Sequence, residues 1–146
     1  MKACGTIEIL LVEDSPSDAF ITQEALKEAT FPTRVHLVPD GVEAMAFLRR
    51  ENQYAAAPRP DIILLDLNTP RKDGREVLSE IKTDVSLKRI PVAVLTSSSA
   101  DSDISTAYDL HANCYITKPS TFGEFKEVIR ALENFWFQSV TLPSND

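Results

Sequence analysis

Glycine is scarce in this chain, which has only four, at positions 5, 41, 74 and 123. Neither of the glycine-rich patterns that bind nucleotide phosphates, GxGxxG and GxxxxGKS/T, occurs among them. The loops that bind nucleotide phosphates depend on the glycines of these two patterns, because only glycine lets the backbone approach the phosphate closely. The sequence therefore disfavours a nucleotide-binding module.

Cysteine and histidine are also sparse, with two residues of each. Cys4 and Cys114 lie far apart and no CxxC pair occurs, so neither a zinc site nor a disulfide framework is indicated. His36 lies in an alternating segment and His111 precedes an expected strand, and we expect neither of them to act as a ligand or a base.

Long apolar runs are missing as well. The longest runs, Ile9 to Val12 and Ile62 to Leu65, are far shorter than the roughly 20 residues of a membrane-spanning helix. The first residues, Met1 to Ile7, contain one lysine and no apolar run of signal-peptide length. We therefore expect a cytoplasmic protein with no membrane partner.

Positive charge is in deficit, because 15 Lys and Arg residues face 22 Asp and Glu residues, which gives a formal net charge of -7. Such a surface repels nucleic acid unless basic residues gather locally. The basic cluster consists of Arg71, Lys72 and Arg75, with Lys88 and Arg89 further along. We interpret this cluster as a solvated rim and expect no nucleic-acid partner.

The chain has the size and composition of one soluble domain, with 146 residues, 43% of them hydrophobic and 25% charged. We expect residues 1–146 to form a single domain, with a core at about 7–137 and a C-terminal tail at 138–146. A second effector domain does not fit in this length. Any output must then come from the surface of the domain itself.

Short apolar runs alternate with segments of helical period, which predicts an α/β fold in which helices cover both faces of a doubly wound, five-stranded parallel sheet. The expected strands are residues 7–12, 34–38, 61–66, 92–96 and 113–117. Five helices are expected, from Pro16 to about Ala29, after Gly41, after Gly74, from about Asp101 and from Thr121.

The last of these helices is rich in aromatic residues. The stripe that we expect to face the sheet consists of Phe122, Phe125, Ile129, Leu132 and Trp136. Successive helical residues turn by about 100°, so Phe135, Trp136 and Phe137 cannot all point into one core. The surplus ring predicts a homodimer through this helix and the neighbouring strand, and packing under the C-terminal tail is the alternative.

Polar side chains follow four of the expected strands: Glu13 and Asp14 after the first, Asp66 at the third, Thr96 at the fourth and Lys118 after the fifth. The carboxyl ends of parallel strands meet at one edge, where ligands bind. Clustered carboxylates raise one another's pKa unless a cation is present, and hard oxygen ligands suit Mg²⁺. We expect this ion to be bound directly by Asp14 and Asp66.

Two further residues complete the expected metal site, Asn68 through its backbone carbonyl and Glu13 through water. A carboxylate beside Mg²⁺ can act as a nucleophile towards a phosphoryl group, which makes Asp66 the predicted phosphoacceptor. Lys118 and Thr96 would then bind phosphoryl oxygens. Taken singly, these residues also suit an N-cap, a turn and a strand end, but their combination is harder to explain in that way.

Five segments together resemble the receiver domains of two-component response regulators. They are Val12 to Asp14, Leu64 to Asn68, Pro70 to Gly74, Leu95 to Ser97 and Tyr115 to Pro119. The stretches 9–14, 61–82, 113–118 and 134–137 are similar to small cyanobacterial phytochrome-associated response regulators. The resemblance implies a flavodoxin-like (CheY-like) fold with strand order 2-1-3-4-5, although Glu13 stands where such proteins often have Asp.

The resemblance also implies what the domain does. A sensor histidine kinase, with a phytochrome kinase as the candidate, would transfer a phosphoryl group to Asp66, and the chain would assist this transfer and its reversal without being a turnover enzyme. Thr96 and Tyr115 match the switch pair of the family, which repacks a surface that here spans Asp101 to Phe137. The Lys118–Pro119 bond is expected to be cis.

Two other functions remain open. A phosphatase of the haloacid dehalogenase type also uses an Asp nucleophile and Mg²⁺, but it has a second Asp two residues later, where this chain has Asn68. An interaction module of receiver fold that works without phosphorylation would keep the fold while losing site residues. The chain retains Asp14, Asp66, Thr96 and Lys118, which favours the phosphorylated receiver.

Overall fold

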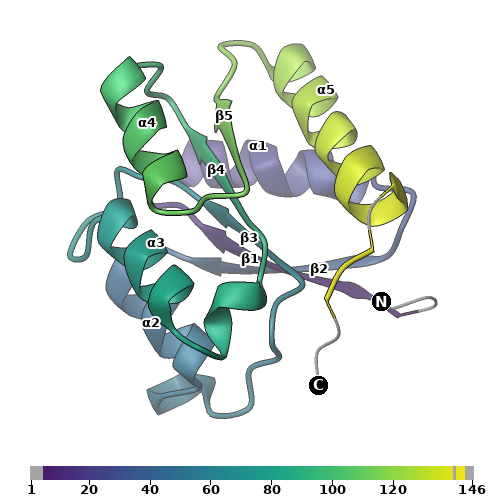
Figure 1. The fold of residues 1–146 in the computed structure, drawn as a ribbon. Helices are drawn as coiled ribbons and strands as arrows, with labels where there is room; N and C mark the ends of the chain where they lie inside the picture. Colours follow the sequence, from purple (N-terminus) through teal and green to yellow (C-terminus); the bar gives the residue numbers. More distant parts are fainter. Residues whose placement is uncertain (1–4, 140, 144–146) are drawn as a thin grey trace.

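A parallel five-stranded sheet forms the centre of the computed structural model, which describes residues 5–139 and 141–143 (Figure 1). The strand order is β2-β1-β3-β4-β5, and every neighbouring pair is parallel. The strands are β1 (Ile7–Val12), β2 (Thr33–Val38), β3 (Ile62–Leu65), β4 (Val92–Thr96) and β5 (Cys114–Thr117). The predicted fold class and strand order are confirmed, with each strand boundary within one residue of its expected position.

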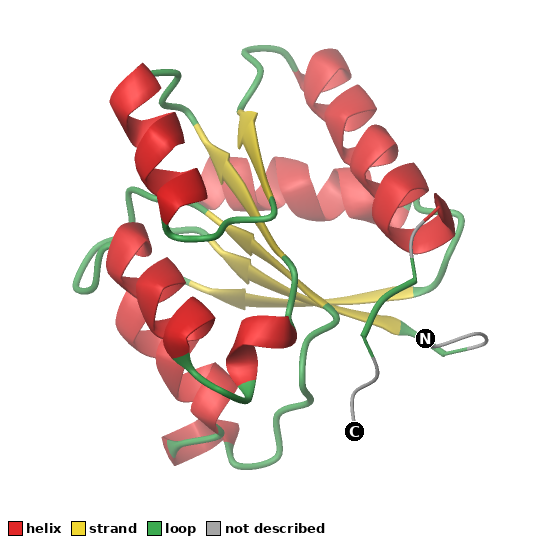
Figure 2. Ribbon diagram, in the orientation of Figure 1, coloured by secondary structure: helices red, strands yellow, loops and turns green. Residues whose placement is uncertain are grey.

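Helices cover both faces of this sheet (Figure 2). They are α1 (Pro16–Lys27), α2 (Gly41–Arg49), α3 (Gly74–Thr83), α4 (Asp101–Asp109) and α5 (Phe122–Glu133), and a π-helical turn (Asn134–Ser139) continues α5. Short 3-10 helices, η1 (Asn52–Tyr54) and η2 (Leu87–Arg89), lie in the connections before β3 and β4. The side chains of Ser15, Asp40, Asp73 and Thr121 accept backbone N–H bonds at the starts of four helices.

The inner strand β1, which lies between β2 and β3, contributes to both hydrophobic cores, because alternate side chains point to opposite faces of the sheet. Leu10 and Val12 pack with α2 and α3, whereas Ile9 and Leu11 pack with α1 and α5. All six β1 residues are buried. Because β1 is covered on both faces, the position of its carboxyl end is fixed. The predicted site begins at this end.

The aromatic end of the chain divides as predicted, except at Phe122. Phe125, Ile129 and Leu132 are buried against the sheet, but Phe122 is 48% exposed. It is the first residue of α5, and Lys126 lies over its ring. Phe137 and Leu142 pack into the same core, while Phe135 is 52% exposed, so Phe135 is the surplus ring.

Three of the positive charges of the predicted basic rim, those of Arg71, Lys72 and Arg75, are matched by carboxylates. Arg71 pairs with Asp40, Lys72 with Glu80, and Arg75 with Asp73 and Asp103. These ion pairs lie on the side of the molecule that α2, α3 and α4 form. The arrangement agrees with a solvated rim.

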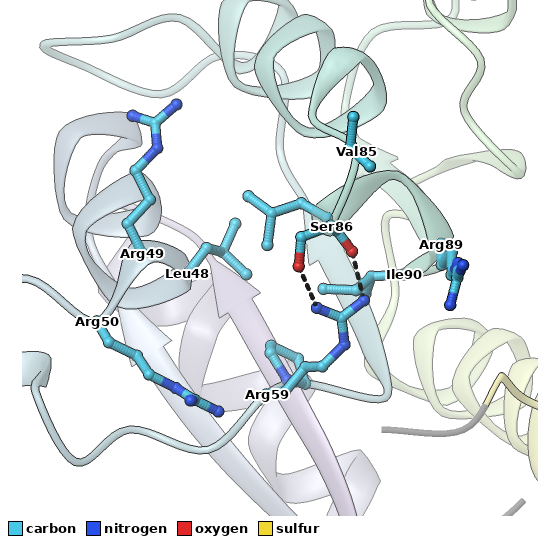
Figure 3. Close-up of a pocket in the computed structure, with 10 residues that line it drawn as sticks. Leu48, Arg49, Arg50, Arg59, Val85, Ser86, Arg89 and Ile90 are labelled. Carbon is cyan, nitrogen blue, oxygen red and sulfur yellow. Dashed lines mark hydrogen bonds between the residues drawn. The ribbon is translucent and has the colours of Figure 1, made fainter. Parts of the chain in front are cut away.

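A second group of basic residues lines a hollow of about 550 Å³ near the amino ends of β3 and β4 (Figure 3). Its arginines are Arg49, Arg50, Arg59 and Arg89. The Arg59 guanidinium donates to the hydroxyl and carbonyl oxygens of Ser86, at 3.4 and 2.6 Å. This contact ties the loop before β3 to the segment before β4, at the opposite edge of the sheet from the predicted site.

None of the described helices is both long and apolar enough to span a membrane.

Gly74 should tolerate no side chain, because a Cβ there would lie 2.5 Å from the Leu67 Cα and 2.6 Å from the Asp66 carbonyl oxygen. We expect Gly74→Ala to lower the free energy of unfolding by about 1–3 kcal/mol, as overpacking does, measured by urea denaturation. Gly123→Ala in α5 is the control, since a Cβ there meets nothing within 4 Å. It should leave stability unchanged or raise it by about 1 kcal/mol, and equal losses in the two variants would contradict the close-approach argument.

Candidate functional site

Asp66 follows β3 and is 7% exposed, and both of its carboxylate oxygens are held by donors from other segments. Oδ1 accepts the backbone N–H of Asn68 at 3.0 Å and the hydroxyl of Thr96 at 2.9 Å. Oδ2 accepts the ammonium of Lys118 at 2.9 Å. The structure thus brings together three strand ends at one carboxylate.

These donors keep Asp66 ionised in spite of its burial. Burial alone would raise the pKa of its carboxyl, but the bonds from Asn68, Lys118 and Thr96 outweigh it and hold the pKa below its ordinary value. An ionised carboxylate has the lone pairs that nucleophilic attack requires. The residue predicted as the acceptor therefore has the protonation state that the role needs.

Lys118 is bonded to three carboxylates at once. Its Nζ donates to Glu13 at 2.6 Å, to Asp18 at 2.8 Å and to Asp66 at 2.9 Å. Burial by itself lowers the pKa of this amine, but the three carboxylates reverse that effect and raise it above its ordinary value. Lys118 is therefore a permanent ammonium in the site.

Asp18 is the site residue that sequence reasoning missed. The sequence analysis gave it no place in the site, although it lies in the first turn of α1, where acids suit the positive end of a helix. The available signal was that α1 begins at Pro16, two residues after Asp14 and two before Asp18, so its first turn lies at the same edge as the site.

Glu13, Asp14 and Asp66 each offer a carboxylate oxygen, and these atoms all lie within 4.8 Å of one another. Glu13 is 4% exposed, and its burial outweighs its bond to Lys118 and raises its pKa to about 7. Asp14 is exposed. Three hard oxygen donors with an excess of negative charge fit a divalent cation such as Mg²⁺ or Mn²⁺.

Asn68 lies beside the nucleophile, with its amide Nδ2 at 3.5 Å from the Thr96 hydroxyl oxygen. Its backbone N–H is directed to Asp66. The binding of a metal by its backbone carbonyl stays a prediction. With an amide at this position, the site has no second carboxylic acid two residues beyond Asp66.

Tyr115 is half-buried in β5, and its hydroxyl donates to the carbonyl oxygen of Ser98 at 2.8 Å. Ser98 follows Thr96 by two residues, and its own hydroxyl bonds to Asp103 of α4 at 2.5 Å. The two residues predicted as the switch pair are thus joined through one short loop.

The expectation of a cis Lys118–Pro119 bond is wrong, because the described residues contain no cis peptide bond. Trans is the intrinsically favoured form before proline, by about 0.5–1 kcal/mol. The Lys118 backbone N–H donates to the Thr96 carbonyl at 2.7 Å, which extends the pairing of β4 and β5 up to the site.

Known proteins are similar to this chain in sequence and in fold. The family model of the response regulator receiver domain matches residues 9–130. Response regulator Rcp1 of Synechocystis sp. is 49% identical over 136 residues, which cover 93% of this chain and 92% of Rcp1.

Two solved structures are similar throughout. The phosphorylated cyanobacterial phytochrome response regulator RcpA has a TM-score of 0.93 and 54% identity, covering 96% of this chain and 100% of that one. The Mn²⁺-bound form of Rcp1 has a TM-score of 0.90 and 48% identity, covering 94% and 99%. The chain therefore belongs to the response regulator receiver domain family, with phytochrome response regulators among its relatives.

Proposed function

We propose that this chain accepts a phosphoryl group on Asp66 from a phosphohistidine of a sensor histidine kinase. The observation that carries the proposal is an ionised, buried carboxylate held by three donors within a cluster of acids. In the transfer a P–N bond of the donor breaks as an O–P bond to Asp66 forms. Positioning and charge neutralisation supply the catalysis.

Glu13, Asp14 and Asp66 are the residues that would hold Mg²⁺. When bound, the ion would neutralise negative charge on the phosphoryl oxygens. The cluster of carboxylate oxygens within 4.8 Å supports this assignment, as does the Mn²⁺-bound form of Rcp1.

Thr96 and Lys118 are already bonded to the two carboxylate oxygens of Asp66, one of which would form the bond to phosphorus. We infer that each turns its donor from Asp66 to a phosphoryl oxygen after transfer. Movement of Thr96 would disturb the bond between Tyr115 and Ser98. The surface made of α4, β5 and α5 would then shift between two packings.

The chain would act as a phosphoacceptor rather than a turnover enzyme. Rapid hydrolysis of an aspartyl phosphate benefits from a second carboxyl group that acts as an acid–base catalyst and takes the proton of the attacking water, and the amide of Asn68 cannot act in this way. The similarity to the phytochrome response regulator RcpA supports a phytochrome kinase as the donor, and we propose the cytoplasm as the place of action.

We also propose a homodimer through the α5 region. Phe135 is 52% exposed beside an apolar hollow of about 500 Å³, whose lining includes Cys114, Ile116, Leu132 and Trp136. A second copy that inserted its Phe135 into this hollow would remove both apolar surfaces from water.

Replacement of Phe135 by Glu tests the dimer, because a charged side chain would be desolvated in the contact. We expect Phe135→Glu to sediment as a monomer in analytical ultracentrifugation where wild type sediments as a dimer. Phe20→Glu is the control, since Phe20 is 62% exposed on α1 and lies outside the proposed contact. A Phe135→Glu protein that remained dimeric would refute this interface.

Intact mass after incubation with a small phosphodonor tests the acceptor. Wild type should gain one phosphoryl group, and only with Mg²⁺, whereas Asp66→Asn should gain none because its amide is not a nucleophile. Asp101→Asn, which changes an exposed acid of α4, should behave as wild type. Addition of a phosphoryl group to Asp66→Asn would show that another residue is the acceptor.

The affinity for Mg²⁺ should depend on pH near neutrality. The pKa of Glu13 is about 7 in the metal-free site, and a cation favours the ionised form. Below that pH a proton must leave Glu13, so affinity should fall by up to about tenfold per unit as pH drops from 7 to 5.5. Isothermal titration calorimetry would measure this.

The Glu13→Gln variant should bind Mg²⁺ more weakly and with a flatter pH profile. Glu24→Gln is the control, because Glu24 pairs with Lys27 on the surface of α1, and it should keep the slope of wild type. An unchanged slope in Glu13→Gln would assign the proton to another group.

A further inference from the structure

Only one of the three carboxylates bonded to Lys118 lies outside the acidic cluster that suits a cation. Glu13 and Asp66 belong to that cluster, but Asp18 does not. The side chain of Asp18 is 36% exposed, against 2% for Glu13 and 8% for Asp66. Asp18 is therefore the partner of Lys118 on the solvent side of the site.

The backbone of Asp18 is fixed from both directions. Its N–H donates to the N-cap side chain of Ser15 at 3.3 Å, and its carbonyl accepts the hydroxyl of the fully buried Thr22 at 2.9 Å. An aspartate has a short side chain with few rotamers. Asp18 can consequently hold an ammonium at a defined place.

A cation in the site would act against the position of Lys118. It would share Glu13 and Asp66 with the ammonium and would repel it as a like charge. Lysine has a flexible four-carbon stem, so without another partner its head group could turn away into solvent. The bond to Asp18 opposes this movement.

We propose that Asp18 is a positioning residue, which keeps Lys118 beside Asp66 when a divalent cation occupies the buried carboxylates. This inference rests on the proposed phosphoacceptor function. Asp18 would touch neither the cation nor the phosphoryl group. It would place the ammonium where the incoming phosphoryl oxygens arrive, on the solvent side of Asp66.

The first test is the rate of phosphorylation by a small phosphodonor at saturating Mg²⁺. We expect Asp18→Asn to react about tenfold more slowly than wild type, since a displacement of about 1 Å in a reacting group can cost up to about a hundredfold in rate. Asp18→Glu, which restores a carboxylate, should recover part of the rate. Glu24→Gln is the matched control, because Glu24 also lies on α1, pairs with a lysine and is 35% exposed.

Mg²⁺ affinity, measured by calorimetry, separates positioning from metal binding. In Asp18→Asn the affinity should change much less than the rate, and additional Mg²⁺ should not restore the rate. If rate and affinity fell together and excess Mg²⁺ restored the rate, Asp18 would act through the cation and the inference would be wrong.

A double-mutant cycle with Lys118→Gln excludes a general effect on α1. Once the ammonium is gone, Asp18→Asn should cause no further loss of rate. Additive losses would refute the inference, and so would equal rates for wild type and Asp18→Asn. Failure of wild type itself to be phosphorylated would instead refute the proposed function, so the two failures are distinguishable.

Discussion

The structure at the carboxyl ends of the strands depends on an excess of negative charge in a small volume. Four carboxylates, those of Glu13, Asp14, Asp18 and Asp66, lie at this edge of the sheet, and all but Asp14 are bonded to the ammonium of Lys118. Charges of one sign are costly to bring together away from water. The sheet, which is buried on both faces and whose strands end at one edge, holds them there. The opposite ionisation behaviour of Glu13 and Asp66 follows from how many donors each receives.

Much of this arrangement could be predicted, because it depends on local pattern. Apolar runs of strand length located the sheet, and polar residues directly after those runs located the site. The pattern could not predict how the helices pack against the loops and the sheet. The contact of Asp18 with Lys118 depends on how α1 packs against the loop after β5. The exposure of Phe122 depends on where α5 begins relative to the sheet.

The loop after β4 is the connection between the site and the rest of the surface. It begins beside Thr96, which bonds to Asp66, and it continues through Ser98 to Asp103 of α4. Asp103 also pairs with Arg75 of α3, at 2.6 Å. Thr96 is therefore linked to β5, α3 and α4, partly through the chain itself and partly through these hydrogen bonds.

The close approach of Gly74 makes the two sides of the site mechanically unequal. The backbone of α3 lies directly against the turn that contains Asp66 and Leu67, and the Gly74 N–H is bonded to the Leu67 carbonyl. Asp66 thus has the backbone of α3 directly behind it, which leaves little room for it to move if a phosphoryl group is added. Under the proposed function the displacement would fall on the loop after β4 on the opposite side, and the direction of the signal would be set by which wall of the site can move.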